Sequence, residues 1–177
     1  MIKNYSLAPL EIPISYTVFK SPIGLTGLIA SSNGLFRLIN KLSSEKAMEK
    51  HLSKLTNGKI TKTPSEFKDL IQQFSKYFEG NLKSFDFPLD LSLGTPFQQK
   101  VWKKLITIPY GKTVSYKWLA SAIKNPQASR AVGNANGKNP LSIIIPCHRV
   151  VRENGELGGY TGGINIKRFL LDLEQAN

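Results

Sequence analysis

Cys147, the only cysteine in this 177-residue chain, is followed directly by His148. A thiol attacks as its thiolate, so a reactive cysteine needs a base or a positive charge close to it, and His148 can be that base. A lone cysteine is more often a small core residue, which is the alternative here. Because neighbours in an extended chain point to opposite faces, we expect a turn, a bridging water or both between thiol and imidazole.

Two helices joined by a short turn are predicted upstream of this pair. Residues 113–123 form the first predicted helix, 124–126 the turn and 127–136 the second helix. A helix pair of this kind on a basic chain suggests docking to DNA. The second helix consists mainly of small residues, which favours close approach to a minor groove. Its one long side chain, Arg130, is a candidate to fill the gap left by a displaced base; a phosphate contact or a surface salt bridge is the alternative.

The charge of the chain favours a polyanionic partner. Lys and Arg number 24 against 12 Asp and Glu, a formal net charge of +12, and nucleic acid is the commonest soluble polyanion. A solvated basic surface or an acidic membrane face would also fit, but no apolar run approaches the roughly 18 residues of a spanning helix. The stretch 1–13 lacks a signal peptide's apolar core, so we expect a cytoplasmic protein, or a nuclear one if the source is eukaryotic.

One cysteine also limits the covalent and metal chemistry of the chain. It allows no internal disulfide, which fits a reducing compartment. With two histidines it supplies too few ligands for a typical zinc site of about four Cys and His side chains, so no metal is expected.

The first half is predicted to be a scaffold of strands and helices. Its expected elements are strands within 14–40, helices over 45–55 and 64–80, and strands over 60–63 and 85–93. Asn33-Gly34 is a hairpin signal, and Ser43 or Ser44 can cap the first helix. The apolar residues of 64–80 recur at helical spacing and are interpreted as a core-facing stripe, so no chemistry is expected in this half. Gly94-Thr95-Pro96 opens the next helix and suggests domains over 1–93 and 94–177.

The hexapeptide Ile145-Pro146-Cys147-His148-Arg149-Val150 resembles the signature of the O6-alkylguanine-DNA alkyltransferases, also called methylated-DNA--protein-cysteine methyltransferases. The resemblance covers about residues 95–174. It includes further motifs in the family's order: Ser115-Tyr116, Ser129-Arg130-Ala131-Val132-Gly133, Asn139-Pro140 and Gly158-Gly159-Tyr160-Thr161-Gly162-Gly163. It implies an α+β fold, with an N-terminal ribonuclease-H-like lobe (a small antiparallel sheet and helices) and an α-helical C-terminal lobe with a helix-turn-helix.

The resemblance also implies a reaction and the residues that perform it. An alkyl group would move irreversibly from O6-alkylguanine, and from O4-alkylthymine, to Cys147 in a single turnover without cofactor or metal. Glu174 would orient His148, which takes the thiol proton through a water. Asn139 would brace the turn around the site, and Tyr116 would donate a proton toward O6 or N3 of the leaving base.

Double-stranded DNA that contains O6-alkylguanine would be the partner of a monomeric protein, with the damaged base flipped out from the minor groove. Arg130 would fill the vacated stack, and Tyr160 would close the pocket wall around the base. Main-chain groups near Cys147, Val150 and Thr161 would read it. The other positions matched to DNA or base binding are Ser115, Ala128, Ser129, Gly133, Asn136 and Lys167.

Two other functions remain open alternatives. A non-catalytic protein that binds alkylated bases resembles this chain but lacks the acceptor cysteine. A helix-turn-helix regulator with a structural cysteine would prefer a specific undamaged operator. Some relatives carry proline at the position of Ser142, in a loop that lines the pocket, so the accepted size of the alkyl group is open.

Overall fold

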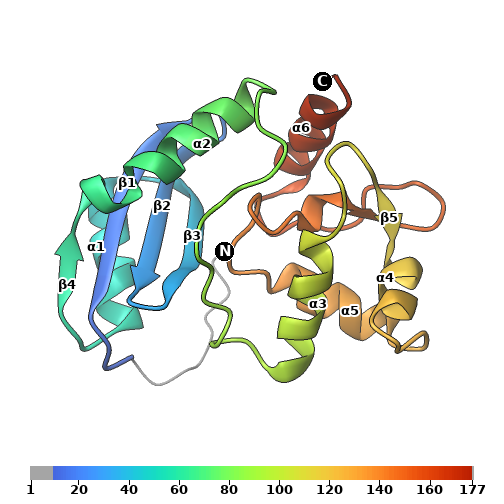
Figure 1. Cartoon of the computed structure of the whole chain (residues 1–177), viewed down its shortest axis with the longest axis horizontal. Helices are drawn as coiled ribbons and strands as arrows, with labels where there is room; N and C mark the ends of the chain where they lie inside the picture. Colours follow the sequence, from blue (N-terminus) through green and yellow to red (C-terminus); the bar gives the residue numbers. More distant parts are fainter. Residues whose placement is uncertain (1–9, 177) are drawn as a thin grey trace.

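A four-stranded sheet forms the N-terminal half of the structure, a computed structural model that describes residues 10–176 (Figure 1). Its strands are β1 (Ile14–Ser21), β2 (Gly24–Ser31), β3 (Gly34–Leu42) and β4 (Ile60–Lys62), in the order β3-β2-β1-β4. β1, β2 and β3 are antiparallel, and β4 runs parallel to β1. The strands predicted within 14–40 and over 60–63 are therefore present. Residues 1–9, part of the stretch examined for a signal peptide, lie outside the described residues.

The strand predicted over 85–93 is wrong, because this stretch forms only one isolated bridge, between Leu35 and Leu89. Pro88 has no N–H to donate to a strand ladder, which explains why the pairing stops. Its carbonyl instead accepts from Leu35 N at 2.8 Å. At Gly34 (φ +128°) a Cβ would lie 2.5 Å from that carbonyl oxygen, so the hairpin needs glycine there. The segment runs on as an irregular connection to the second half (Figure 1).

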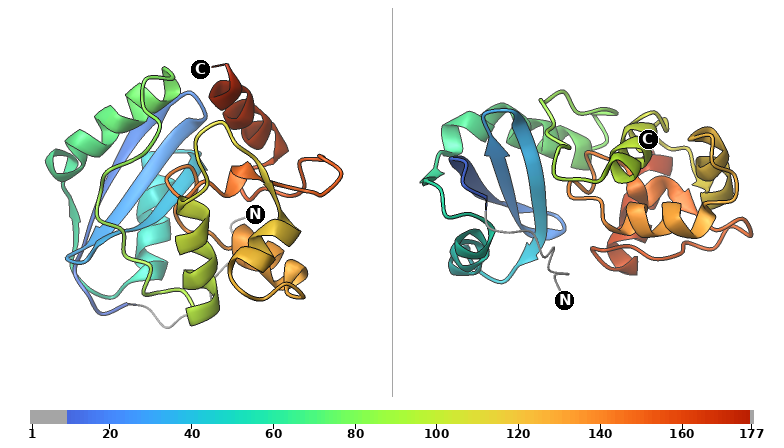
Figure 2. Two further views of the ribbon diagram at one scale, coloured as in Figure 1. Left: turned by 45° about the vertical axis from the view of Figure 1, so that its right-hand side comes forward. Right: turned by 90° about the horizontal axis from the view of Figure 1, so that it is seen from below.

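Helices α1 (Glu45–Leu55) and α2 (Lys68–Phe78) cover opposite faces of the sheet (Figure 2). Ser44, one of the two predicted caps, accepts from Ala47 N at 3.1 Å and starts α1. The buried residues of α1 form one cluster with one face of the sheet. The buried residues of α2 belong to a second cluster, with the face of the sheet that also packs against the C-terminal half. The stripe predicted for 64–80 is therefore buried as expected, with a 3-10 turn, η1 (Pro64–Phe67), leading into α2.

The C-terminal half is mainly helical (Figure 1). Its elements are α3 (Pro96–Ile106), β5 (Val114–Ser115), α4 (Tyr116–Ala122), α5 (Ser129–Gly137), η2 (Cys147–Arg149), β6 (Val150–Val151) and α6 (Ile164–Gln175). A reciprocal pair of hydrogen bonds between Thr95 and Gln98 caps α3, at the predicted start. No helix among residues 10–176 is long and apolar enough to cross a membrane.

The predicted helix pair is present with shifted starts. The first helix begins at Tyr116 and not at 113, because Val114 and Ser115 pair with β6 and the Ser115 hydroxyl then caps α4 by accepting from Trp118 N at 3.0 Å. The second helix begins at Ser129 and not at 127, since the turn after Pro126 extends to Ala128.

A continuous hydrophobic cluster joins the two halves. It includes Leu38 of β3 and Phe74 of α2 from the first half, together with buried residues of α3, α4, α5 and α6. Two polar contacts run alongside: Leu38 N donates to Pro140 O at 2.8 Å, and Asn40 Nδ2 donates to Ser142 Oγ at 2.9 Å. The sheet thus supports the segment before Cys147 directly. The expected domain boundary after residue 93 stays a prediction.

Candidate active site

The only cysteine lies in a tight turn within a fully buried segment. Every residue from 141 to 150 is buried, and Cys147 begins the 3-10 turn η2. Ile143 has φ +79°, a region that β-branched residues rarely adopt, so the chain reverses sharply just before this turn. The Cys147 N–H donates to Ile145 O at 2.7 Å. A turn is therefore present at Cys147, while the pairing of its thiol with the His148 imidazole stays a prediction.

Two asparagines from the end of α5 and the residues after it hold this turn. Asn139 Nδ2 donates to Ile145 O at 2.8 Å, and Leu141 N donates to Asn139 Oδ1 at 3.0 Å. Asn136 Nδ2 donates to Cys147 O at 3.4 Å. Both amides are buried, so their hydrogen bonds fix the backbone on either side of the sulfur.

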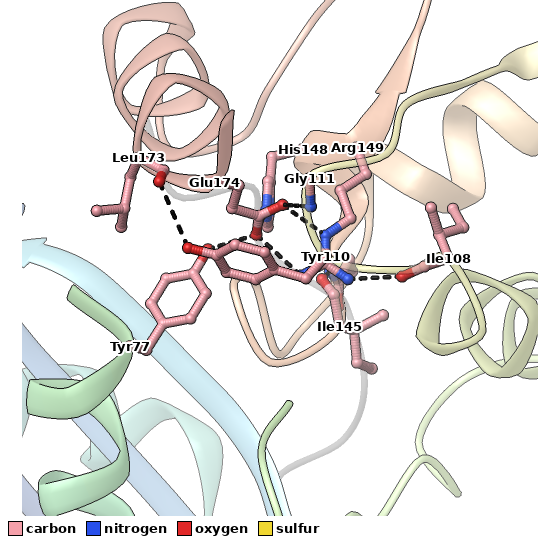
Figure 3. A network of polar contacts seen from close by, with 10 residues as sticks. Tyr77, Ile108, Tyr110, Gly111, Ile145, His148, Arg149, Leu173 and Glu174 are labelled. Atoms are coloured by element: carbon pink, nitrogen blue, oxygen red, sulfur yellow. Dashed lines mark hydrogen bonds and ion pairs between the residues drawn. The ribbon is translucent and has the colours of Figure 1, made fainter. Parts of the chain in front are cut away.

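The Glu174 carboxylate of α6 accepts five hydrogen bonds (Figure 3). Its Oε1 accepts from His148 Nε2 at 2.8 Å, Tyr77 Oη at 2.7 Å and Arg149 Nη2 at 2.9 Å. Its Oε2 accepts from Arg149 Nε at 2.8 Å and Gly111 N at 3.1 Å. The four partners come from three separate stretches of the chain, and all of them donate.

This arrangement determines the protonation of the histidine. Burial opposes ionisation of Glu174, but the hydrogen bonds and charges of His148 and Arg149 hold the pKa of this carboxyl well below its usual range. Burial lowers the pKa of His148 in spite of the opposing influence of Glu174, so the imidazole is neutral at pH 7. A carboxylate only accepts, so Nε2 carries the proton and Nδ1 the lone pair. Nδ1 is buried and has no hydrogen-bond partner among residues 10–176.

The Cys147 thiol is held in its protonated form. Its residue is 4% exposed, and burial raises the pKa of the thiol to about 11. A hydrogen bond from Asn139 and the charge of Lys167 act in the opposite direction but do not outweigh burial. Attack by this sulfur at neutral pH therefore requires a base, and the Nδ1 lone pair of the adjacent His148 is suited to that task.

Lys167 is a buried cation beside this segment. Its Nζ donates to Val150 O at 2.5 Å and also to Leu157 O. Burial lowers the pKa of Lys167 to about 8, with the negative charge of an ionised Cys147 acting against that shift. The side chain thus joins α6 to β6 and to the loop over 152–163.

Two tyrosines interact electrostatically with Cys147. Burial raises the pKa of both Tyr116 and Tyr160, and the negative charge of an ionised Cys147 adds to each rise. The Tyr160 ring stands edge-on to the His148 ring, with centroids 6.5 Å apart at 86°. At Gly158 (φ +66°) a Cβ would lie 3.0 Å from Tyr116 Oη, so glycine allows the loop to approach this phenol.

The expected DNA-binding positions divide into exposed, half-buried and buried groups. Arg130 is exposed in the first turn of α5, and Thr161 is exposed with Oγ1 donating to Gly137 O at 2.6 Å. The half-buried positions are Ser115, Ala128, Ser129 and Gly133, and the buried ones are Asn136, Val150 and Lys167. The side chains of the buried group bond or pack inside the protein. Their expected contacts with DNA or a base stay predictions.

Three groups around Glu174 were missed from the sequence. Arg149 stands inside the signature hexapeptide but was given no role, and the Gly111 N–H carries no side-chain signal. Tyr77 was interpreted only as part of an apolar stripe, although its hydroxyl is a polar atom among the buried positions of α2. The second histidine, His51, lies in α1 with Nε2 at 3.5 Å from Arg37 Nη1. Within residues 10–176, no group of three or more His, Cys, Asp or Glu side chains is placed to hold a metal ion.

Comparison with known proteins places this chain among DNA alkyltransferases. Residues 14–91 match the ribonuclease-like domain of 6-O-methylguanine DNA methyltransferase, and residues 96–176 match its DNA binding domain. A methylated-DNA--protein-cysteine methyltransferase of Methanosarcina acetivorans is 45% identical over 90% of this chain and 97% of its own length.

Solved structures agree with this match. The O6-methylguanine methyltransferase of Mycobacterium tuberculosis is 45% identical and superposes with a TM-score of 0.79, covering 92% of this chain and 93% of that one. A structure of the M. tuberculosis OGT in complex with DNA gives a TM-score of 0.76 at 44% identity, with the same coverage. The chain belongs to the 6-O-methylguanine DNA methyltransferase family, whose curated relatives carry the name methylated-DNA--protein-cysteine methyltransferase.

Proposed function

We propose that this chain repairs DNA by transferring the alkyl group of O6-alkylguanine, and of O4-alkylthymine, to Sγ of Cys147. The observation that carries the proposal is the buried His148–Glu174 pair, which leaves a lone pair on Nδ1 of the residue that follows the only cysteine in the sequence. Family membership supports the same reaction. A cysteine that served only for packing would not need an oriented imidazole next to it.

The reaction begins with proton removal from the thiol. His148 Nδ1 takes the Cys147 proton through a bridging water, and Glu174 stabilises the imidazolium that forms. The sulfur lone pair attacks the alkyl carbon, so an S–C bond forms while the C–O6 bond breaks and its electrons stay on the base. Tyr116 donates a proton to the base at O6 or N3. The imidazolium of His148 then returns its proton, through solvent, to the phenolate of Tyr116. The net result is that the thiol proton moves to guanine.

The product explains why the protein acts once. A thioether has no acyl carbon for water to attack, and no group in the proposed mechanism regenerates the thiol. Each molecule therefore removes one alkyl group, and the reaction is stoichiometric and irreversible.

Access to the alkyl carbon requires that the base leave the duplex. Flipping costs a few kcal/mol and is easiest for a lesion that pairs poorly. The small residues of α5 would permit close approach to the minor groove, and the exposed Arg130 would enter the vacated stack. The M. tuberculosis relative described in complex with DNA supports DNA as the partner. A monomeric state, a cytoplasmic location and the domain boundary after residue 93 belong to the same proposal.

Intact-mass analysis tests the proposal directly. The protein is incubated with duplex DNA that contains O6-methylguanine, and one added methyl group on Cys147 is expected, with the Cys147→Ser variant as the unreactive control. The variant should bind the duplex as tightly as the parent protein. Tight binding of the lesion without any mass change indicates an alkylated-base-binding protein, and preference for one undamaged sequence indicates a regulator; either result contradicts the transfer reaction.

A further inference from the structure

A phenol of the N-terminal half contacts the His148–Glu174 pair. Tyr77 lies near the end of α2, and its Oη is 2.7 Å from Glu174 Oε1, a residue 97 positions later in the chain (Figure 3). Tyr77 is 1% exposed and Glu174 3% exposed, so this hydrogen bond is shielded from water. A hydrogen bond to a charged group in such surroundings is stronger than one at a surface.

The Tyr77 hydroxyl acts only as a donor in this contact. Burial raises the pKa of Tyr77 far above its usual value, and the negative charge of Glu174 raises it further, so the phenol stays protonated. Aromatic neighbours also fix its ring: the centroids of Phe85 and Tyr110 lie 5.3 Å and 6.1 Å from that of Tyr77. The donor is therefore held in place before any substrate binds.

The same carboxylate oxygen accepts from Tyr77 and from His148. Oε1 is thus also held by a group of the N-terminal half, while Arg149 spans both oxygens. A carboxylate that loses one of these donors can rotate and also concentrates more negative charge on Oε1. Both changes reach His148 directly, because its Nε2 proton is bonded to that oxygen.

We propose that Tyr77 is a positioning residue for alkyl transfer, which acts through Glu174 to set the orientation and the basicity of His148. This inference rests on the proposed function. It gives the sheet-and-helix half of the chain a part in the chemistry besides support of the fold.

The test compares Tyr77→Phe with Tyr110→Phe. Tyr110 Oη donates to Leu173 O at 3.4 Å and not to the carboxylate, so its loss removes a hydroxyl from the same cluster without removing a hydrogen bond to Glu174. Single-turnover methyl transfer is measured for each variant with saturating O6-methylguanine duplex across the pH range in which His148 titrates. The dissociation constant for the duplex is measured separately.

Tyr77→Phe should lower the saturated rate constant by about tenfold, a part of the roughly 100-fold or more that general base catalysis contributes. Affinity for the duplex should not change. The acid limb of the pH–rate profile should move to higher pH, because Glu174 with one donor fewer makes His148 more basic. Tyr110→Phe should leave the profile in place. A Tyr77→Phe profile that coincides with that of the parent protein, or a loss of rate shared equally by Tyr110→Phe, overturns the proposal.

A second substitution covers the case in which Tyr77→Phe does not fold. Incorporation of 3-fluorotyrosine at position 77 keeps the ring and hydroxyl but makes the hydroxyl a stronger donor, so the acid limb should move to lower pH. An unmoved limb contradicts a role for this donor. If the parent protein itself gains no methyl group, the proposed function fails; if it reacts and only these shifts are absent, the inference about Tyr77 fails alone.

Discussion

Lys167 Nζ and the carbonyl oxygen of Val150 lie 2.5 Å apart, and this contact joins α6 to the strand that follows the reactive turn. The same ammonium donates to Leu157 O in the loop over 152–163. That loop carries Tyr160, whose ring faces His148 edge-on. One buried cation therefore joins β6 to the loop that carries Tyr160.

Replacement of Lys167 by Met should loosen this loop. The variant keeps most of the side-chain volume but leaves two carbonyls without their donor, and an unsatisfied buried acceptor costs about 1–3 kcal/mol. We expect the free energy of unfolding in urea to fall by about 2 kcal/mol, with faster amide exchange over 152–163. Arg168→Met, which changes an exposed residue of the same helix, serves as the control and should have little effect. Equal effects of the two changes would contradict this role of Lys167.

The buried thiol should react slowly with small alkylating reagents. Burial raises the pKa of Cys147 to about 11, against 9.0 for an ordinary thiol. Each pKa unit is a factor of ten in thiolate, so at pH 8 the folded protein should react with iodoacetamide about 100-fold more slowly than the urea-unfolded chain. Its rate should continue to rise up to about pH 11. A plateau near pH 9 in the folded protein would show that the thiol is not shifted.

The Glu174 carboxylate should make stability depend on pH in the acid range. Its pKa lies below the ordinary 4.5 in the folded chain, so its stabilising contribution is complete above pH 4.5 and is lost as the pH falls below that value. Glu174→Gln leaves Arg149 buried without its counter-charge and should lower the free energy of unfolding at pH 7 by about 3 kcal/mol. The variant should also lose part of the acid dependence.

Chemical denaturation at a series of pH values measures this difference. Glu153→Gln is the matched control, because Glu153 pairs with Lys117 on the surface at 3.2 Å with 69% of its side chain exposed. That variant should follow the parent protein closely. Parallel curves for the parent protein and Glu174→Gln below pH 4.5 would contradict the low pKa of Glu174.

Arg130 should matter for duplex DNA and not for single strands. If its side chain fills the stack left by the flipped base, Arg130→Ala loses that support only where a stack exists. We expect transfer from duplex O6-methylguanine to slow by about tenfold, while transfer from a single-stranded oligonucleotide changes little. Lys103→Ala, which removes an exposed charge from α3, controls for general attraction to phosphates. Equal slowing on both substrates would favour a plain phosphate contact.

Local signals in the sequence predicted much of the fold. Asn33-Gly34 indicated the hairpin, and Thr95 with Pro96 indicated the start of α3, because turn and cap preferences depend on a few adjacent residues. The failures depend on partners far along the chain. Val114 and Ser115 are extended because β6 lies beside them, and 85–93 remains irregular because Pro88 meets Gly34. Neither partner can be identified from local preferences alone.

The sequence predicted those residues of the candidate site that are neighbours along the chain or that belong to a family motif. Cys147 and His148 are neighbours in the sequence, and the resemblance added Glu174 and Asn139. Tyr77 was missed because helical periodicity tells which face of α2 is buried, and not which distant acceptor a hydroxyl on that face will meet. Its partner lies 97 residues away, so only the tertiary structure reveals the contact.

The position of Glu174 near the C-terminal end of α6 has a consequence while the polypeptide is being synthesised. Glu174 follows His148 by 26 residues, and all of its partners, Tyr77, Gly111, His148 and Arg149, precede it in the chain. While the ribosome has made Cys147 but not α6, the imidazole of His148 lacks the carboxylate that accepts from its Nε2. If the proposed mechanism holds, a nascent or prematurely terminated polypeptide without α6 should therefore transfer alkyl groups poorly, because its general base is not oriented.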